Sequence, residues 1–311
     1  MNHLESSFTG KNAFWRYFIM VVAVFLASNT IGSIPLIISM LAHPEAMKDI
    51  SVNPNDLTPL GLDPNLLLAY MLIPFIAGLA AFILLIKPLN LRSFTSVING
   101  TDRFRWNRFI VAGLVWTVIS AVYLFISLRL DPDNFTLNNT TVMLIPLILI
   151  SVLMIPFQAV LEEVLFRGYL MQGFAVLVRN RIFPLVVTSL LFGIMHGLNP
   201  EVKEFGFWTM MPQYILFGLI FGVMTILDDG IEAAMGAHTA NNVFLCIMVT
   251  NESSALQTPA LYEQYQIQPW SEFISMLVMG VVVIVILKVI FRWKGFSLLF
   301  SNIVAKNPDV V

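Results

Sequence analysis

Long apolar segments recur along this 311-residue chain and leave little choice of fold. Hydrophobic residues make up 58% of the chain and charged residues only 12%, whereas a soluble domain has about 25% charged residues. A helix needs about 20 apolar residues to cross a bilayer, where its backbone must satisfy its own hydrogen bonds. The composition therefore predicts an all-α, polytopic membrane protein. Its net charge of −2 excludes the basic surface typical of nucleic-acid binding.

Apolar runs and turn residues predict about eight transmembrane helices. We place them at Phe14–Leu41, Asn65–Ile86, Phe109–Leu128, Val142–Phe166, Phe183–Leu198, Met211–Leu227, Ile231–Thr250 and Phe273–Phe291. The fifth and sixth are short, which indicates tilt or burial within the bundle. The tight turn Asp228-Asp229-Gly230 predicts that the sixth and seventh form an antiparallel pair. Gly236 and Gly280 would allow close helix contacts.

Basic residues favour an even number of spans with both termini in the cytoplasm. With eight spans, 14 of the 17 Lys and Arg residues fall on the side of the termini. These are Lys11, Arg16, Lys87, Arg92, Arg103, Arg105, Arg108, Arg167, Arg179, Arg181, Lys288, Arg292, Lys294 and Lys306, and the other side holds Lys48, Arg129 and Lys203. Cytoplasmic loops of membrane proteins carry such an excess of positive charge.

The chain divides into three parts. Residues 1–140 hold membrane helices without a recognised motif, residues 141–250 hold the polar motifs, and residues 251–311 hold an outer loop, the last span and a cytoplasmic tail. The apolar run from Phe18 to Leu41 exceeds the roughly 7–15 residues of a signal-peptide core, so we expect it to remain as the first span. A single cysteine, Cys246, excludes an intramolecular disulfide.

Glu162, Glu163 and Arg167 follow a charge-free stretch from Val142 to Leu161. Each charged residue at membrane depth costs about 2.5–3.5 kcal/mol on insertion scales, so three together indicate a functional site. Glu163 and Arg167 are four residues apart with the acid first, which favours an ion pair on one helix face. Glu162 points about 100° away on the helix. An unpaired carboxylate of this kind suits general-base catalysis.

The other buried polar groups also repeat at helical spacing. Phe192 and His196 are four residues apart, as are His238 and Asn242, so each pair projects from one helix face. A carboxylate with an imidazole can hold and deprotonate water, and His and Asn donors can stabilise an oxyanion. Asn241 fits packing or a supporting position better than a catalytic one. Covalent catalysis is disfavoured because no serine lies in a nucleophile elbow.

Together the three motifs resemble those of the CPBP family, which comprises type II CAAX prenyl endopeptidases and bacterial bacteriocin-processing, immunity and abortive-infection proteins. The motifs are Glu162-Glu163-x-x-x-Arg167, Phe192-x-x-x-His196 and His238-x-x-x-Asn242, in this order on separate apolar segments. The resemblance implies a glutamate-type intramembrane endopeptidase with residues 141–250 as its catalytic core and its site inside the helical bundle. It implies that Glu162 and His196 activate water, that His238 and Asn242 form the oxyanion hole, and that Glu163 and Arg167 support them.

The resemblance also implies partners and location. We expect the lipid bilayer and a peptide or protein substrate, prenylated or otherwise membrane-associated, in a bacterial or archaeal cell membrane, and no nucleic acid. We expect no cofactor. Zinc is the alternative, but the HExxH arrangement of zinc proteases is absent. The oligomeric state is left open.

Two points stay open from the sequence. A transporter, scaffold or regulatory protein also uses buried Glu, Arg and His residues, for proton coupling or partner binding. A protease needs Glu162 and His196 within reach of one water, whereas a transporter needs a path to both sides. The assigned spans place Glu162 near the cytoplasmic side, where we expect cleavage, but they place His196 toward the outer side. The distance between these residues is therefore the deciding observation.

Overall fold

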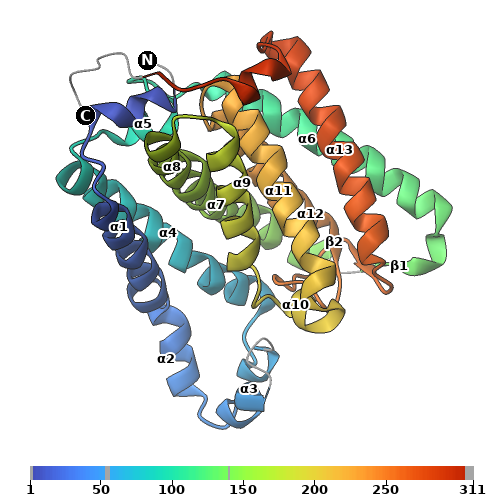
Figure 1. Ribbon diagram of the computed structural model, residues 1–311. Helices are drawn as coiled ribbons and strands as arrows, with labels where there is room; N and C mark the ends of the chain where they lie inside the picture. The colour runs from blue at the N-terminus through green and yellow to red at the C-terminus, as the bar shows by residue number, and fades with distance from the viewer. Residues whose placement is uncertain (1–2, 53–56, 139–140, 305–311) are drawn as a thin grey trace.

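The computed structural model describes residues 3–52, 57–138 and 141–304, and within them the chain is almost entirely helical (Figure 1). The α-helices are α1 (Phe14–Ala27), α2 (Ile34–Ala42), α3 (Met47–Val52), α4 (Pro64–Asn90), α5 (Phe94–Ile98), α6 (Trp106–Leu130), α7 (Thr141–Glu163), α8 (Met171–Val178), α9 (Ile182–Met195), α10 (Pro200–Phe205), α11 (Phe207–Asp228), α12 (Glu232–Met248) and α13 (Pro269–Phe291). The π-helical segments are η2 (Ser28–Gly32) and η5 (Val164–Leu170). The 3₁₀ segments are η1 (Glu5–Thr9), η3 (Thr58–Leu60), η4 (Pro132–Asn134) and η6 (Phe296–Phe300), and the strands are β1 (Phe135–Leu137), β2 (Val249–Thr250) and β3 (Tyr262–Gln264).

The bundle has two distinct ends (Figure 1). The terminal end carries η1, α5 and η6, whereas the sheet end carries the small β1-β3-β2 sheet and α10. In the sheet, β1 pairs antiparallel with β3 and β2 pairs parallel with it. Four helices, α4, α8, α11 and α13, end at the terminal end. Each is followed by a residue with left-handed backbone conformation, which is Leu91, Arg179, Asp229 and Arg292 respectively. The helices thus run between two ends of different chemistry.

Six helices among the described residues are long and apolar enough to cross a membrane. They are Phe14–Ala42, Pro64–Asn90, Trp106–Leu130, Val142–Val178, Phe207–Asp228 and Pro269–Phe291. The predicted fold class is confirmed, but the predicted count of eight is too high. The fifth and seventh predicted spans correspond to α9, of 14 residues, and α12, of 17. Fourteen residues rise only about 21 Å, short of the roughly 30 Å of hydrocarbon.

Helix α12 lies within the bundle, where it packs against α6, α7 and α11. A side chain at Gly236 would overlap the carbonyl oxygen of Phe109, so glycine there permits the close approach of α6. Gly280 permits a similar contact with Ile220, and both predicted close contacts are confirmed. The predicted antiparallel pairing of α11 and α12 across their tight turn is also confirmed. Protein rather than lipid surrounds the first half of α12, which can therefore carry polar residues.

The helix that carries the first motif is longer than predicted. α7, η5 and α8 form one helical segment, Val142–Val178, of 37 residues. The prediction ended this span at Phe166, so Glu162 lies inside the segment and not at its end. The backbone changes to π-helix at Val164, directly after the two glutamates. Such π segments frequently occur at functional sites.

Candidate active site

Glu163 and Arg167 form the ion pair that their spacing predicts. Nη1 of Arg167 lies 2.9 Å from Oε1 of Glu163, and neither side chain is exposed. The guanidinium also lies over the ring of Phe192, 4.2 Å from its centroid, so the first two motifs are in contact. Counting Arg167 among the cytoplasmic loop residues is therefore wrong. It is buried because its carboxylate partner lies one helical turn away.

Glu162 points away from this pair toward two histidines. Its Oε2 lies 4.0 Å from Nε2 of His196 and 3.7 Å from Nε2 of His238. The side chains of Glu162 and His238 are each 6% exposed and that of His196 17%. The predicted spans placed Glu162 and His196 at opposite sides of the membrane, but the structure places them at the same depth. The reasons are that α9 is too short to carry His196 across the bundle and that Glu162 lies well inside its own helix.

Two contacts fix the ring of His196, the residue that directly follows α9. Its Nδ1 donates to the carbonyl oxygen of Phe192 at 2.7 Å. Because a carbonyl oxygen only accepts, Nδ1 carries the proton, and Nε2 of the neutral ring is an acceptor that faces Glu162. The ring also stacks on Tyr214, with centroids 4.6 Å apart and planes at 19°. His196 is thus held in a defined tautomer and orientation.

His238 contacts both glutamates with different nitrogen atoms. Its Nδ1 donates to Oε1 of Glu163 at 2.8 Å, while its Nε2 faces Glu162. The ring stacks on Phe221, with centroids 5.0 Å apart. Oε1 of Glu163 therefore joins Arg167 to His238, a link that helical spacing alone does not predict.

Asn242 lines the same cavity and has an oriented amide. Its Oδ1 accepts a hydrogen bond from Nδ2 of Asn241 at 3.0 Å. The Oδ1 of Asn241 in turn accepts from the indole N–H of Trp116 at 3.1 Å. Since the oxygen of Asn242 is occupied, its Nδ2 is the group available to the cavity. Asn241, expected in a packing or supporting position, connects Asn242 to α6.

A cavity of about 340 Å³ brings the four predicted catalytic residues to one surface. Glu162, His196, His238 and Asn242 all line it, whereas Glu163 and Arg167 lie behind the wall. Apolar side chains such as Phe217 line other parts. The volume lies in the range of roughly 300–1,000 Å³ that ligand sites occupy. The predicted site is therefore spatially compact, and the roles of its residues remain predictions.

Tyr214 and Gln158 are among the cavity residues that the sequence interpretation missed. Tyr214 stacks on His196, and its hydroxyl group binds Glu201 and, at 3.0 Å, Nδ2 of Asn199. These partners belong to another element, so no local spacing points to Tyr214. Gln158 lies one turn before Glu162, and its buried Oε1 has no hydrogen-bond partner among the described residues. For Gln158 the spacing of four from Glu162 was an available signal.

The donor groups of the described residues bear on metal binding. Among the residues that the structure describes, no cluster of three or more His, Cys, Asp or Glu side chains is arranged to hold a metal ion. Independence from a cofactor stays a prediction that requires an experiment.

Fold and site together define a polytopic helical membrane protein in which a carboxylate and two imidazoles meet in a cavity inside the bundle. Residues 142–244 match the family model described as "Type II CAAX prenyl endopeptidase Rce1-like". The match covers about a third of the chain and includes all three motifs. The chain thus carries a domain of this membrane protease family, and the resemblance to the CPBP family is confirmed.

A curated relative extends the similarity beyond this domain. The chain is 27% identical over 285 residues to "Uncharacterized protein YyaK" of Bacillus subtilis (strain 168). The alignment covers 89% of this chain and 93% of the relative. The relative's name states no activity, so it shows the extent of the similarity and not its function. No solved structure matches the chain significantly.

Proposed function

We propose that the protein is an intramembrane endopeptidase in which Glu162 and His196 activate a water molecule. The observation that carries this proposal is the separation of 4.0 Å between Oε2 of Glu162 and Nε2 of His196. This separation is too long for a direct hydrogen bond, but one water can bond to both atoms. Both atoms accept hydrogen bonds, so the water donates a hydrogen to each and turns an oxygen lone pair toward the substrate.

The remaining residues complete a hydrolytic mechanism. The water oxygen attacks the carbonyl carbon of the scissile peptide bond, and Glu162 takes the proton. The imidazolium form of His238, with its Nδ1–H on Glu163, donates its Nε2–H to the oxyanion that forms, and Asn242 donates its Nδ2–H. Contacts of this type contribute about 10²–10³ to the rate. Glu162 then returns its proton to the leaving nitrogen as the C–N bond breaks. One water is consumed, and a new carboxyl and a new amino terminus result.

Glu163 and Arg167 support this chemistry from behind the cavity wall. Glu163 accepts the Nδ1 hydrogen of His238 and so turns Nε2 toward the reacting groups. Arg167 pairs with the same carboxylate and supplies its counter-charge inside the bundle. The pair thus orients one donor of the oxyanion hole without touching the substrate.

The substrate is a peptide or protein segment at the membrane. Proteins of the matching family include prenyl endopeptidases by name, and a prenylated peptide is one form of a membrane-associated substrate. A peptide must reach Glu162 in an extended form, because only then is its carbonyl carbon accessible to a water held by Glu162 and His196. The cavity inside the bundle supplies the space for such a segment.

The transporter alternative finds less support. A transporter needs access to the site from both ends, whereas the residues between Glu162 and the terminal end are packed. Glu163, Ile231 and Met235 in that layer have no exposed surface. A cavity with one closed end suits a hydrolytic site better than a transport path.

Terminal proteomics of membranes from cells that produce the wild type or Glu162→Gln tests the proposal. Gln has nearly the same shape as Glu but cannot take the proton of water, so membrane-proximal termini made by the wild type are expected to disappear. Glu204→Gln, an exposed change in α10 outside the cavity lining, serves as the matched control and is expected to keep them. The same termini at wild-type level with Glu162→Gln would contradict the mechanism. Activity lost to a chelator and restored by zinc would contradict the expected independence from metal.

A further inference from the structure

The cavity of the candidate active site opens at the sheet end of the bundle. Its rim is formed by Asn199 after α9, by residues of the segment 251–256 and by Gln264 of β3. These rim residues are half-buried, whereas Glu162 and His238 are buried at the floor. Among the described residues, η1, α5 and η6 contribute nothing to the lining. The route from water to Glu162 therefore begins at the sheet end.

The terminal end is closed beneath the same floor. α5 packs against η5, and the carbonyl oxygen of Ile98 accepts a hydrogen bond at 2.9 Å from the backbone N–H of Ile231, just before α12. Both side chains are buried. At the next position Oε1 of Glu232 accepts from Nε of Arg105 at 2.9 Å, which ties α12 to the start of α6. Apolar packing and an ion pair thus separate the site from this end.

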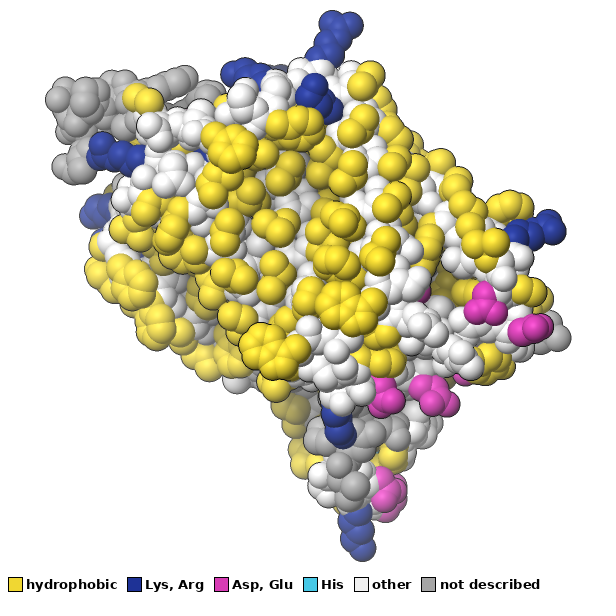
Figure 2. Space-filling model, turned by 45° about the vertical axis from the view of Figure 1, so that its right-hand side comes forward, with side chains coloured by type: hydrophobic (Ala, Val, Ile, Leu, Met, Phe, Trp, Pro, Cys, Tyr) yellow, Lys and Arg dark blue, Asp and Glu magenta, His cyan; other side chains and the backbone are white. Residues whose placement is uncertain are grey.

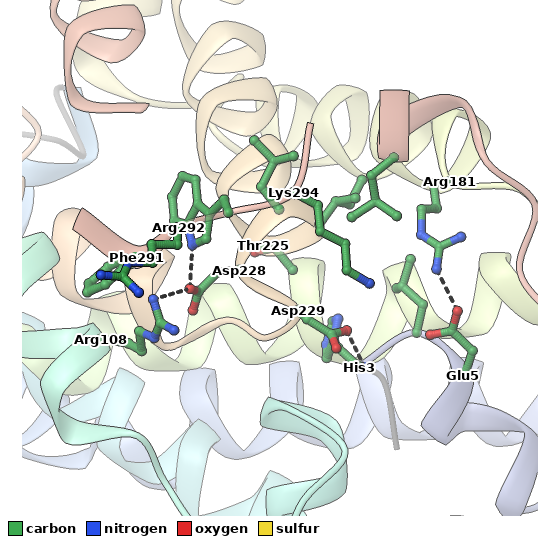
Figure 3. A pocket seen from close by; sticks show the side chains of 15 residues that line it. His3, Glu5, Arg108, Arg181, Thr225, Asp228, Asp229, Phe291, Arg292 and Lys294 are labelled. Carbon is green, nitrogen blue, oxygen red and sulfur yellow. Dashed lines mark hydrogen bonds and ion pairs between the residues drawn. The ribbon is translucent and has the colours of Figure 1, made fainter. Parts of the chain in front are cut away.

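An ion pair and a hydrogen bond also hold the N-terminal segment against this end (Figure 3). Arg181 pairs with Glu5 at 2.5 Å, and the backbone N–H of His3 donates to Oδ1 of Asp229 at 2.8 Å. Figure 3 shows these two contacts among the side chains that line a second pocket, of about 180 Å³. Within the described part of the chain, that pocket and the candidate active site have no lining residue in common. The closure therefore consists of several layers of protein.

Charge identifies the two ends. Of the 14 basic residues assigned to the side of the termini, Arg167 is buried and Lys306 lies outside the described residues. The other twelve lie at the terminal end. Arg129 and Lys203 lie at the sheet end, and Lys48 lies in α3, also opposite the terminal end (Figure 1). In the face shown in Figure 2, Asp and Glu side chains gather at the sheet end. The excess of basic residues in cytoplasmic segments therefore assigns the terminal end to the cytoplasm.

From the opening and the charges we infer that the candidate active site takes its substrate from the outer side of the membrane, opposite the termini. The inference rests on the proposed proteolytic function and names its substrate class, a peptide segment exposed on the outer face. It replaces the expectation of cleavage near the cytoplasmic side. Glu162 lies deep in the bundle, but the open route to it starts at the outer end, among the polar rim residues. A peptide tail confined to the cytoplasm would meet the closed end.

Thiol labelling of protoplasts tests the side of access. Cys246→Ala removes the single cysteine, and Gln158→Cys then places one thiol in the cavity wall. The probe is a charged thiosulfonate that does not cross membranes. Ser297→Cys, exposed in η6 at the terminal end, is the matched control, and Ser254→Cys at the rim is a second reporter if the first variant does not accumulate.

The reporter thiol and the control thiol are expected to react under opposite conditions. The cavity or rim thiol should react in intact protoplasts, and the Ser297→Cys thiol only after permeabilisation. A cavity thiol that reacts only after permeabilisation, with the control reacting in intact protoplasts, would overturn the inference. Labelling does not depend on proteolysis. If the cavity thiol reacts in intact protoplasts but no cleavage product forms, the result contradicts the proposed function alone. If cleavage products form but the cavity thiol reacts only after permeabilisation, the result contradicts the access inference alone.

Discussion

Nδ1 of His238 lies 2.8 Å from Oε1 of Glu163, the same oxygen that binds Arg167. One buried carboxylate thus holds both a positive charge and an imidazole, while Nε2 of that imidazole faces the neighbouring Glu162. The two adjacent glutamates therefore have different surroundings. Substitution at each is expected to have a different effect.

Glu163→Gln is expected to lower both activity and stability. Removing one partner of a buried ion pair costs about 3–5 kcal/mol, because Arg167 is left buried without a counter-charge. Glu162→Gln is expected to abolish cleavage with little change in stability, since no Lys or Arg pairs with Glu162 among the described residues. Thermal unfolding in detergent, measured beside cleavage, separates the two effects. A Glu163→Gln protein as stable as the wild type would show that this pair does not hold the bundle together.

Tyr214 is expected to act as a positioning residue for His196. Tyr214→Leu removes the stacked ring and should lower kcat about tenfold, a fraction of the roughly 10²–10⁴ that a general base contributes. Tyr214→Phe keeps the ring and loses only the hydroxyl contacts with Asn199 and Glu201, so its effect should be smaller. The measurement is kcat against KM for both variants. Equal losses in the two variants would show that the hydroxyl group, and not stacking, is what matters.

Contacts within one helix account for what the sequence predicted well. Glu163 and Arg167 meet because residues four apart share a helix face, and the same spacing places His238 and Asn242 together on α12. The meeting of His196 with Glu162 was not predictable from the apolar runs. Such runs do not reveal that α9 ends after 14 residues or that α7 continues through η5.

Contacts between distant segments account for what was missed. Trp116 and Asn241 are 125 residues apart, and Tyr214 comes to His196 from a different helix. The count of spans failed for a related reason. α12 is apolar and of nearly sufficient length, but it is surrounded by α6, α7 and α11. Hydropathy does not distinguish a helix buried in protein from one that faces lipid.

Acidic pH is expected to release the N-terminal segment. Burial lowers the pKa of His3 from 6.5 to about 3, opposed by a hydrogen bond to the carbonyl of Val97. A detached segment regains a pKa of about 6.5. Between pH 6.5 and 3 the detached segment binds a proton that the docked one does not, so docking is strongest above pH 6.5 and weakens as the pH falls through this window.

Hydrogen exchange of residues 5–9 at pH 7.5 and pH 5, corrected for the intrinsic rates, measures this release. Protection is expected to fall at pH 5 in the wild type. His3→Gln, which cannot titrate, is the control and should show the same protection at both values. Undiminished protection of the wild type at pH 5 would mean that His3 does not set the pH response.

Trp116 is expected to influence catalysis through two hydrogen bonds, by way of Asn241 to Asn242. Asn242→Ala removes the proposed oxyanion donor and should lower kcat by about 10²–10³. Trp116→Phe keeps most of the ring packing but removes the indole N–H, so Asn241 no longer holds the amide firmly and kcat should fall about tenfold with KM little changed. The double variant should be no slower than Asn242→Ala alone, because both changes act on one donor group. Additive losses in the double variant would show that Trp116 acts through packing of α6 against α12 and not through Asn242.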